Sequence, residues 1–138
     1  MTGADALVDT SVAVAFVVAD HDHHEMVVEA LSGRRLGLAG HAAFETFSVL
    51  TRLPAPLRRV PASLDRLLAT NFPHSRFLGP EGAALLLTRL AAAGIAGGSV
   101  NDALVGAVAV EHDLPLATRD RRALDTYGLL GAEVELIG

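Results

Sequence analysis

The sequence predicts an α/β fold with a mostly parallel central sheet covered by helices on both faces. Short apolar runs typical of buried strands alternate along the chain with longer segments of helical periodicity. The chain has 138 residues, 51% of them apolar, which is enough for one domain with a sizeable core. The sequence contains no internal repeat and no long interior linker, so we expect a single domain over residues 1–138.

The predicted elements follow from this periodicity and from the residues that end each segment. Strands are expected at 6–8, 35–39, 76–78, 114–118 and 133–137, the third of them weak. Helices are expected at 12–19, 21–31, 41–53, 61–71, 81–93, 99–112 and 121–127. The helix over 41–53 should bury Ala43, Phe47 and Leu50, and the helix over 99–112 should pack through Ala103, Gly106, Ala107 and Val110.

The composition excludes several classes of protein. All 11 basic residues are arginine, so mechanisms that need a lysine are excluded, and the absence of cysteine excludes disulfides and thiol chemistry. The net charge of -5 argues against gripping nucleic acid by bulk electrostatics. The longest uncharged stretch, 90–101, is too short to span a membrane, and segment 1–7 lacks the features of a secretion signal. We therefore expect a cytoplasmic protein without a membrane partner.

Two acidic residues directly follow predicted strands. Asp9 and Asp120 would lie at the carboxyl edge of a parallel sheet, which is where ligands bind in such folds. Each also has a purely structural interpretation, because an Asp between a strand and a helix commonly caps the helix. The position alone leaves both interpretations open.

Two further acidic residues lie on predicted helices. Asp102 has the spacing of a capping box with Ser99 as the N-cap, and Glu45 shares a polar helix face with Arg52. The four acids point to a function because the predicted fold would bring three of them to one edge of the sheet. Crowded carboxylates repel one another unless a cation intervenes, and a site made only of oxygen ligands suits Mg²⁺ or Mn²⁺.

Four segments, in order and spacing, resemble the acidic motifs of PIN-domain nucleases, and most of all those of VapC toxins from toxin-antitoxin pairs. These segments are 7–11 (LVDTS), 44–50 (FETFSVL), 101–109 (NDALVGAVA) and 116–120 (LATRD). The resemblance covers essentially the whole chain. It implies a PIN-like, Rossmann-like three-layer α/β/α fold.

The same resemblance implies a function and a set of site residues. The function is that of a Mg²⁺- or Mn²⁺-dependent endoribonuclease toxin, a homodimer neutralised by an antitoxin, in which a metal-activated water cleaves structured RNA to leave a 5′-phosphate and a 3′-hydroxyl. The implied metal-binding and catalytic acids are Asp9, Glu45, Asp102 and Asp120. Ser11 and Thr118 would be supporting hydroxyls. Local arginines would have to hold the RNA, and the candidates beside the site are Arg119, Arg121 and Arg122.

Alternatives to this function remain. A noncatalytic PIN-like module would bind RNA or a protein and keep the acids for folding, and a third possibility is cleavage of DNA or of a flap structure. The segment from Asp20 to Glu25 holds three histidines, and the spacing of His21 and Glu25 allows a transition-metal site as well as an ordinary polar helix start. Glycines 94, 97 and 98 follow a helix, so they do not form a dinucleotide-binding motif.

Overall fold

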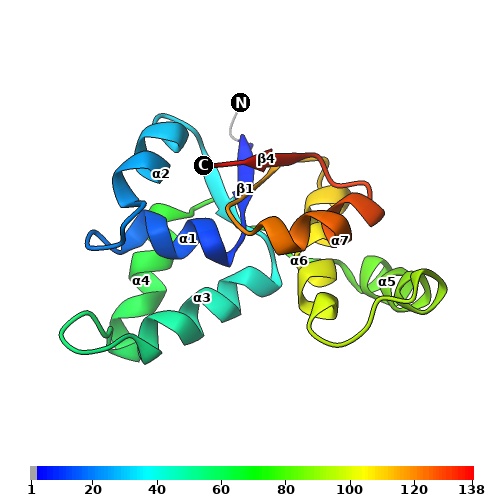
Figure 1. Cartoon of the computed structure of the whole chain (residues 1–138), viewed down its shortest axis with the longest axis horizontal. Helices are drawn as coiled ribbons and strands as arrows, with labels where there is room; N and C mark the ends of the chain where they lie inside the picture. The colour runs from blue at the N-terminus through cyan, green and yellow to red at the C-terminus, as the bar shows by residue number, and fades with distance from the viewer. Residues whose placement is uncertain (1–2) are drawn as a thin grey trace.

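The computed structural model describes residues 3–138 and forms a three-layer α/β/α fold (Figure 1). Met1 and Thr2 lie outside the described residues. Both belong to segment 1–7, which lacks the features of a secretion signal in sequence. The elements in chain order are β1 (Ala6–Val8), α1 (Thr10–Val17), α2 (His24–Leu31), β2 (Leu36–Leu38), α3 (His41–Arg52), α4 (Pro61–Asn71), α5 (Pro80–Ala93), α6 (Ser99–Glu111), β3 (Leu116–Thr118), the 3₁₀ turn η1 (Arg121–Ala123), α7 (Leu124–Leu129) and β4 (Val134–Leu136).

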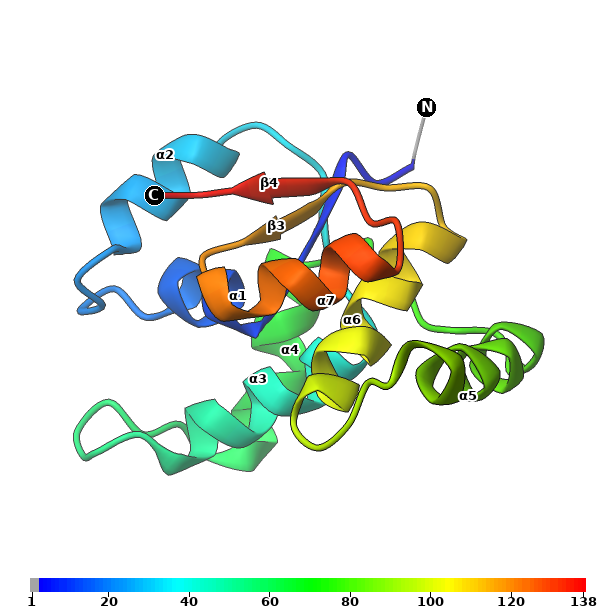
Figure 2. The same cartoon turned by 45° about the vertical axis from the view of Figure 1, so that its right-hand side comes forward.

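The central sheet has four strands in the order β2-β1-β3-β4, and every neighbouring pair is parallel. Figure 2 shows β3 and β4 running side by side in the same direction. Val8, the last residue of β1, is in register with Leu38 of β2 and Ala117 of β3. The chain therefore leaves β1 and β3 at the same edge of the sheet, where Asp9 and Asp120 were expected.

Alternation along the strands gives each face of the sheet its own core. Ala6 and Val8 point into a cluster with buried residues of α1 and α2, whereas Leu7 points into a second cluster with residues of α6 and α7. All three strand residues are fully buried. Because both faces are covered, the strands are continuously apolar, as is usual for parallel sheets.

The strand predicted at 76–78 is wrong: only Arg76 bridges to the sheet, opposite Ala39. The segment does run along the outer side of β2, where the main-chain N–H groups of His74 and Arg76 donate to the carbonyls of Leu36 and Leu38. Gly37 permits this approach, since a Cβ on it would lie 2.0 Å from the carbonyl oxygen of His74. The pairing ends there because the chain turns into α5, which begins at Pro80.

The predicted buried helix faces need two corrections. In α3 the buried residues are Ala42, Thr46 and Leu50, and Phe47 stays 37% exposed beside a groove between α3 and α4. Val110 of α6 is 40% exposed, although its neighbours Val108 and Ala109 are buried. Both errors are shifts of about one residue around the helix, which periodicity alone resolves poorly.

Several element boundaries also differ from the prediction, by one to three residues. The second helix begins at His24 and not at residue 21, the first ends at Val17, and the last begins as the η1 turn before α7. Within residues 3–138, no helix has the length and hydropathy that crossing a bilayer requires.

Candidate active site

Asp9 is the buried centre of the carboxyl edge of the sheet. Its side chain is only 4% exposed, and its main-chain N–H donates to the carbonyl of Ala117, which continues the β1–β3 pairing. Oδ1 accepts hydrogen bonds from the Val12 main-chain N–H (3.2 Å) and the Ser11 hydroxyl (2.6 Å). Asp9 is thus the N-cap of α1, as one interpretation of the sequence predicted, and it lines the site at the same time.

The other carboxylate oxygen of Asp9 is held by residues from distant parts of the chain. Oδ2 accepts hydrogen bonds from the Thr118 hydroxyl at the end of β3 and from the Tyr127 hydroxyl of α7 (2.9 Å). Ser11 in turn accepts from the main-chain N–H of Arg119, and Thr118 accepts from that of Asp120. Ser11 and Thr118 therefore each connect the Asp9 carboxylate to the main chain that leads to Asp120.

Asp120 caps the turn that follows β3. Its Oδ1 accepts from the main-chain N–H of Arg122 (3.0 Å), so the capping interpretation is confirmed for this residue too. Asp102, by contrast, is not part of a capping box. The N-cap of α6 is Gly98, no side chain caps that helix, and Ser99 is already its first helical residue. Asp102 in the first turn faces the site instead.

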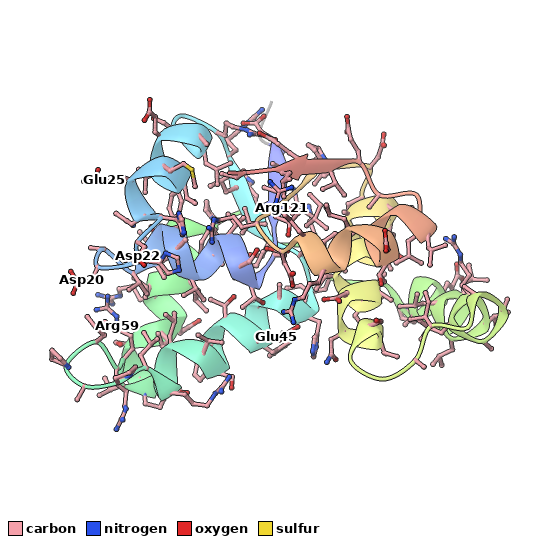
Figure 3. The ribbon with its side chains drawn as sticks, in the orientation of Figure 1. Asp20, Asp22, Glu25, Glu45, Arg59 and Arg121 are labelled. Atoms are coloured by element: carbon pink, nitrogen blue, oxygen red, sulfur yellow. The ribbon has the colours of Figure 1, made fainter. Side chains whose placement is uncertain are left out.

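Glu45 completes the set from α3, where its Oε1 lies 3.5 Å from Nε2 of His41. In Figure 3 its label lies near the middle of the molecule, where α1, α3, α6 and α7 approach one another. The four acids surround one cavity of about 60 Å³. Its lining residues are Asp9, Thr10, Ser11, Glu45, Asp102, Val105, Asp120 and Tyr127.

The electrostatics of this cavity are those of crowded carboxylates. Burial raises the pKa of Asp102, and the nearby charges of Asp120, Glu45 and Asp9 raise it further. Burial also raises the pKa of the Asp9 carboxyl, while its hydrogen bonds from Ser11, Thr118 and Tyr127 act in the opposite direction. In a site with this charge, binding a proton or a cation would relieve the repulsion between the carboxylates.

The donor set fits a hard divalent cation. The cavity offers carboxylate oxygens from four segments and no sulfur, and a single water needs only roughly 10–15 Å³. Within residues 3–138, no three acidic or histidine side chains have the spacing of a ready-made metal site. Mg²⁺ tolerates this arrangement, because it commonly keeps several waters and takes only one or two carboxylates directly.

The three arginines predicted beside the site differ in their surroundings. Arg122 has a side chain that is 93% exposed, with its Nε 3.4 Å from Oδ1 of Asp120. Arg121 donates to the carbonyl of Gly138 (3.4 Å), and the Nε of Arg119 is buried without a hydrogen-bond partner. Figure 3 places Arg121 above Glu45 in the central part of the molecule.

The histidine-rich segment lies apart from the site. Asp20, Asp22 and Glu25 lie at one side of the molecule in Figure 3, well separated from Glu45. The histidine nitrogens serve local contacts: Nδ1 of His21 accepts from the main-chain N–H of His23, and Nδ1 of His24 lies 2.9 Å from the carbonyl oxygen of Ala15. No acidic or histidine cluster in the described part of the chain has metal-site spacing, so the transition-metal interpretation of this segment receives no support.

Sequence reasoning missed Tyr127. It is the only tyrosine of the chain, it is 2% exposed, and its hydroxyl bonds directly to Asp9. One signal was available: a tyrosine buried in a small domain needs a hydrogen-bond partner for its hydroxyl. Nothing in the local sequence indicates that this partner is 118 residues away.

The chain is similar in sequence to known proteins. The family model described as "PIN domain" matches residues 6–129, a range that includes all four acids. The chain is 46% identical over 127 residues to Ribonuclease VapC27 of Mycobacterium tuberculosis, covering 92% of this chain and 93% of the relative. It is 44% identical over 131 residues to Ribonuclease VapC40 of the same species, covering 94% and 96%.

Solved structures are similar in fold. FitAcB from Neisseria gonorrhoeae superposes with a TM-score of 0.67 at 20% identity, covering 94% of this chain and 95% of that chain. VapBC2 from Rickettsia felis, bound to a DNA fragment from their promoter, gives a TM-score of 0.65 at 15% identity, covering 95% and 97%. From the family match and the VapC relatives together, the chain belongs to the PIN-domain family, as a member of its VapC type.

Proposed function

We propose that this protein is a metal-dependent endoribonuclease toxin that cleaves structured RNA of the transfer or ribosomal RNA class. The observation that carries the proposal is the convergence of four carboxylates, from four separate segments, on one cavity at the carboxyl edge of the sheet. The relatives VapC27 and VapC40 are named ribonucleases, which supports the activity. The substrate class and the metal are our inference.

In the proposed reaction, water hydrolyses an RNA phosphodiester and leaves a 5′-phosphate and a 3′-hydroxyl. Asp9, Glu45, Asp102 and Asp120 would hold Mg²⁺ or Mn²⁺, which when bound polarises phosphoryl oxygens and lowers the pKa of water. Asp9 can hold one orientation because its two oxygens accept four hydrogen bonds. This preorganisation means that the carboxylate needs little rearrangement during the reaction.

The exposed guanidinium of Arg122 is the best placed of the three arginines for an RNA phosphate. Its partner Asp120 already lines the cavity, so a phosphate beside Arg122 would lie next to the acids. Arg119 and Arg121 are proposed as weaker contributors, because Arg119 is half-buried and Arg121 contacts the C-terminal carbonyl. A bidentate arginine contact with phosphate is geometrically favourable.

Two protein partners belong to the same proposal: a second copy of the chain and a cognate antitoxin. The similar structures named VapBC2 and FitAcB support an antitoxin partner. In sedimentation, a mass near twice 14.4 kDa would support the homodimer, and the mass of one chain would contradict it. A short protein encoded beside this gene, added in equal amount, should abolish RNA cleavage if it is the antitoxin.

The deciding experiment is cleavage of a mixed pool of transfer and ribosomal RNA by the purified, antitoxin-free chain. We expect cuts at discrete sites with Mg²⁺ or Mn²⁺, none with EDTA, and 5′-phosphate ends at each cut. The variant Asp102→Asn should keep the fold and lose at least about 10-fold in rate, because it removes one acid of the proposed metal-binding set. Asp22→Asn makes the same chemical change on an exposed residue and should cut as wild type.

Several outcomes would contradict the proposal. Cleavage that persists in EDTA would contradict metal dependence, and equal activity of Asp102→Asn would remove the acids from the mechanism. Cleavage of DNA in preference to RNA would favour a nuclease that acts on DNA or on a flap structure. A folded protein that binds RNA but cuts nothing would favour the noncatalytic module.

A further inference from the structure

Tyr127 contacts one of the four acids directly and also packs against the helix that carries a second. Its hydroxyl lies 2.9 Å from Oδ2 of Asp9, at the end of β1. Its ring packs against Gly106 of α6, where a Cβ would lie only 3.1 Å from Cδ1 of Tyr127. Gly106 is four residues after Asp102, one turn along the same helix, so both residues lie on the same side of α6.

The other hydrogen-bond donors to Asp9 come from the first turn of α1 or from the adjacent strand. Ser11 and Val12 belong to the helix that Asp9 caps, and Thr118 belongs to β3, which pairs with β1. Among these four partners, only Tyr127 comes from α7 and is packed against the helix that carries Asp102. Ser11, Val12 and Thr118 can therefore orient Asp9 on the sheet, whereas Tyr127 sets its position relative to α6.

We propose that Tyr127 is a positioning residue, whose hydroxyl and ring together hold Asp9 and Asp102 in one arrangement around the cavity. This inference rests on the proposed metal-dependent nuclease function. A rigid aromatic side chain with two torsion angles suits the task, and its buried hydroxyl is aimed at the carboxylate. Groups that orient metal-binding side chains in this way commonly change metal affinity or activity by about 10- to 100-fold when removed.

The variant Tyr127→Phe tests the hydroxyl while keeping the ring. We expect unchanged secondary structure, a weaker Mg²⁺ affinity by about 10-fold or more in calorimetry, and a kcat for RNA cleavage that falls by about 10- to 100-fold. The KM for RNA should stay within about twofold, because the Tyr127 hydroxyl is buried against Asp9 and leaves no exposed group for an RNA phosphate. Mg²⁺ affinity and kcat both within about twofold of wild type would overturn the inference.

Two further variants separate positioning from general stability. Gly106→Ala keeps the hydroxyl but pushes on the ring of Tyr127, so it should also lower kcat and Mg²⁺ affinity. Leu64→Val weakens a cluster with Val18 and Leu50 that contains no site residue, and it should change neither. If Leu64→Val lowers the unfolding temperature as much as Tyr127→Phe does and loses kcat equally, the effect is one of stability and the inference is wrong.

The sequence supplies an optical measurement that does not depend on activity. Tyr127 is the only tyrosine and there is no tryptophan, so the intrinsic emission of the protein comes from Tyr127. An excited phenol is a stronger acid than in the ground state, so a hydrogen-bonded carboxylate quenches it by accepting the proton. We expect dim wild-type emission that rises on addition of Mg²⁺, and brighter emission from Asp9→Asn without metal. Asp102→Asn should start as dim as wild type and respond less to Mg²⁺.

These results distinguish the inference from the proposed function. A wild type that neither binds Mg²⁺ nor cuts RNA would remove the proposed function itself. If wild type binds Mg²⁺ and cuts RNA, and Tyr127→Phe binds and cuts equally well, only the role of Tyr127 is contradicted. Equal emission from wild type and Asp9→Asn would show that the hydroxyl does not hold the carboxylate in solution.

Discussion

Asp102 is a site residue whose ionised form is disfavoured both by burial and by the charges of the other three acids. It lies in the first turn of α6 without acting as a cap, and the charges of Asp120, Glu45 and Asp9 face it across the cavity. Burial and these charges raise its pKa, which means that folding disfavours its ionised form. Its ionisation therefore lowers the stability of the folded chain in the absence of a cation.

We predict that Asp102→Asn stabilises the metal-free protein while abolishing its response to metal. The raised pKa gives the sign: the penalty is absent at about pH 3, where Asp102 is protonated in both states, and grows as pH rises above about 4. In EDTA at about pH 7 the variant should unfold at a higher temperature than wild type, and the two should converge at about pH 3. Mg²⁺ should then stabilise wild type and leave the variant nearly unchanged.

Differential scanning fluorimetry with an added dye, over a pH series with EDTA or Mg²⁺, measures both effects. Asp22→Asn makes the same change on an exposed residue at the side of the molecule and should match wild type (Figure 3). If the variant is less stable than wild type in EDTA at neutral pH, the Asp102 side chain makes a net stabilising contribution to the fold, and the prediction is wrong.

Individual acids were predictable from the sequence to different degrees. Asp9 and Asp120 directly follow strands of a parallel sheet, so their place at one edge follows from topology, and both act as caps as well. For Asp102 the spacing to Ser99 predicted a cap that the structure lacks, because the helix begins one residue early. Tyr127 could not be located, since its contact with Asp9 depends on how α7 packs against α6.

At the scale of elements, an ion pair joins the residues that precede the paired strands β1 and β2. Asp5, just before β1, accepts hydrogen bonds from the main-chain N–H of Arg35 (2.7 Å) and from its guanidinium (2.9 Å). These contacts lower the pKa of Asp5 to about 2. Each strand has only three residues, so a contact at their shared start matters for their pairing.

We predict that Asp5→Asn removes part of the acid sensitivity of the fold. A folded-state pKa below the unfolded one stabilises the protein above the unfolded value, near 4, and this stability is lost as pH falls toward 2. The unfolding temperature of wild type should therefore drop more steeply between about pH 4 and pH 2 than that of the variant. At neutral pH the variant should be the less stable of the two.

Circular dichroism melting curves across this range provide the measurement, and Asp22→Asn again serves as the matched control. Parallel pH curves for wild type and Asp5→Asn would show that the Asp5–Arg35 pair does not contribute to stability. The pair is half-exposed, so raising the salt concentration should reduce the difference.

Most elements were predictable because periodicity and helix-ending residues agree with the tertiary structure. The exception at 76–78 shows what local pattern cannot determine: the segment has a strand-like pattern, but the chain turns into α5 after a single bridge at Arg76. The buried face of α3 was displaced for a related reason. Its packing against α1, α4 and α6 selects Ala42, Thr46 and Leu50, and the sequence does not name those neighbours.

At the scale of the whole molecule, the charge distribution limits how RNA can be bound. The chain carries a net charge of -5, and the site itself contributes four acids. Under the proposed function, RNA would be held by a few local arginines, and a bound metal would offset the repulsion between the acids and the phosphates. This differs from a nucleic-acid-binding protein with a broad basic surface, in which many phosphates are neutralised at once.

The salt dependence of RNA binding tests this distribution. Each phosphate contact on a single strand changes the slope of log K against log salt by about 0.7, so one to three arginine contacts predict a slope magnitude of about 0.7–2. Arg122→Gln should weaken binding several-fold and reduce the slope by about 0.7, because it removes one exposed cation beside Asp120. Arg59→Gln, far from Glu45 in Figure 3, should leave the slope unchanged. Fluorescence anisotropy in an Asp102→Asn background avoids cleavage during the measurement, and a slope magnitude above about 5 would show that RNA contacts a much wider surface than the site.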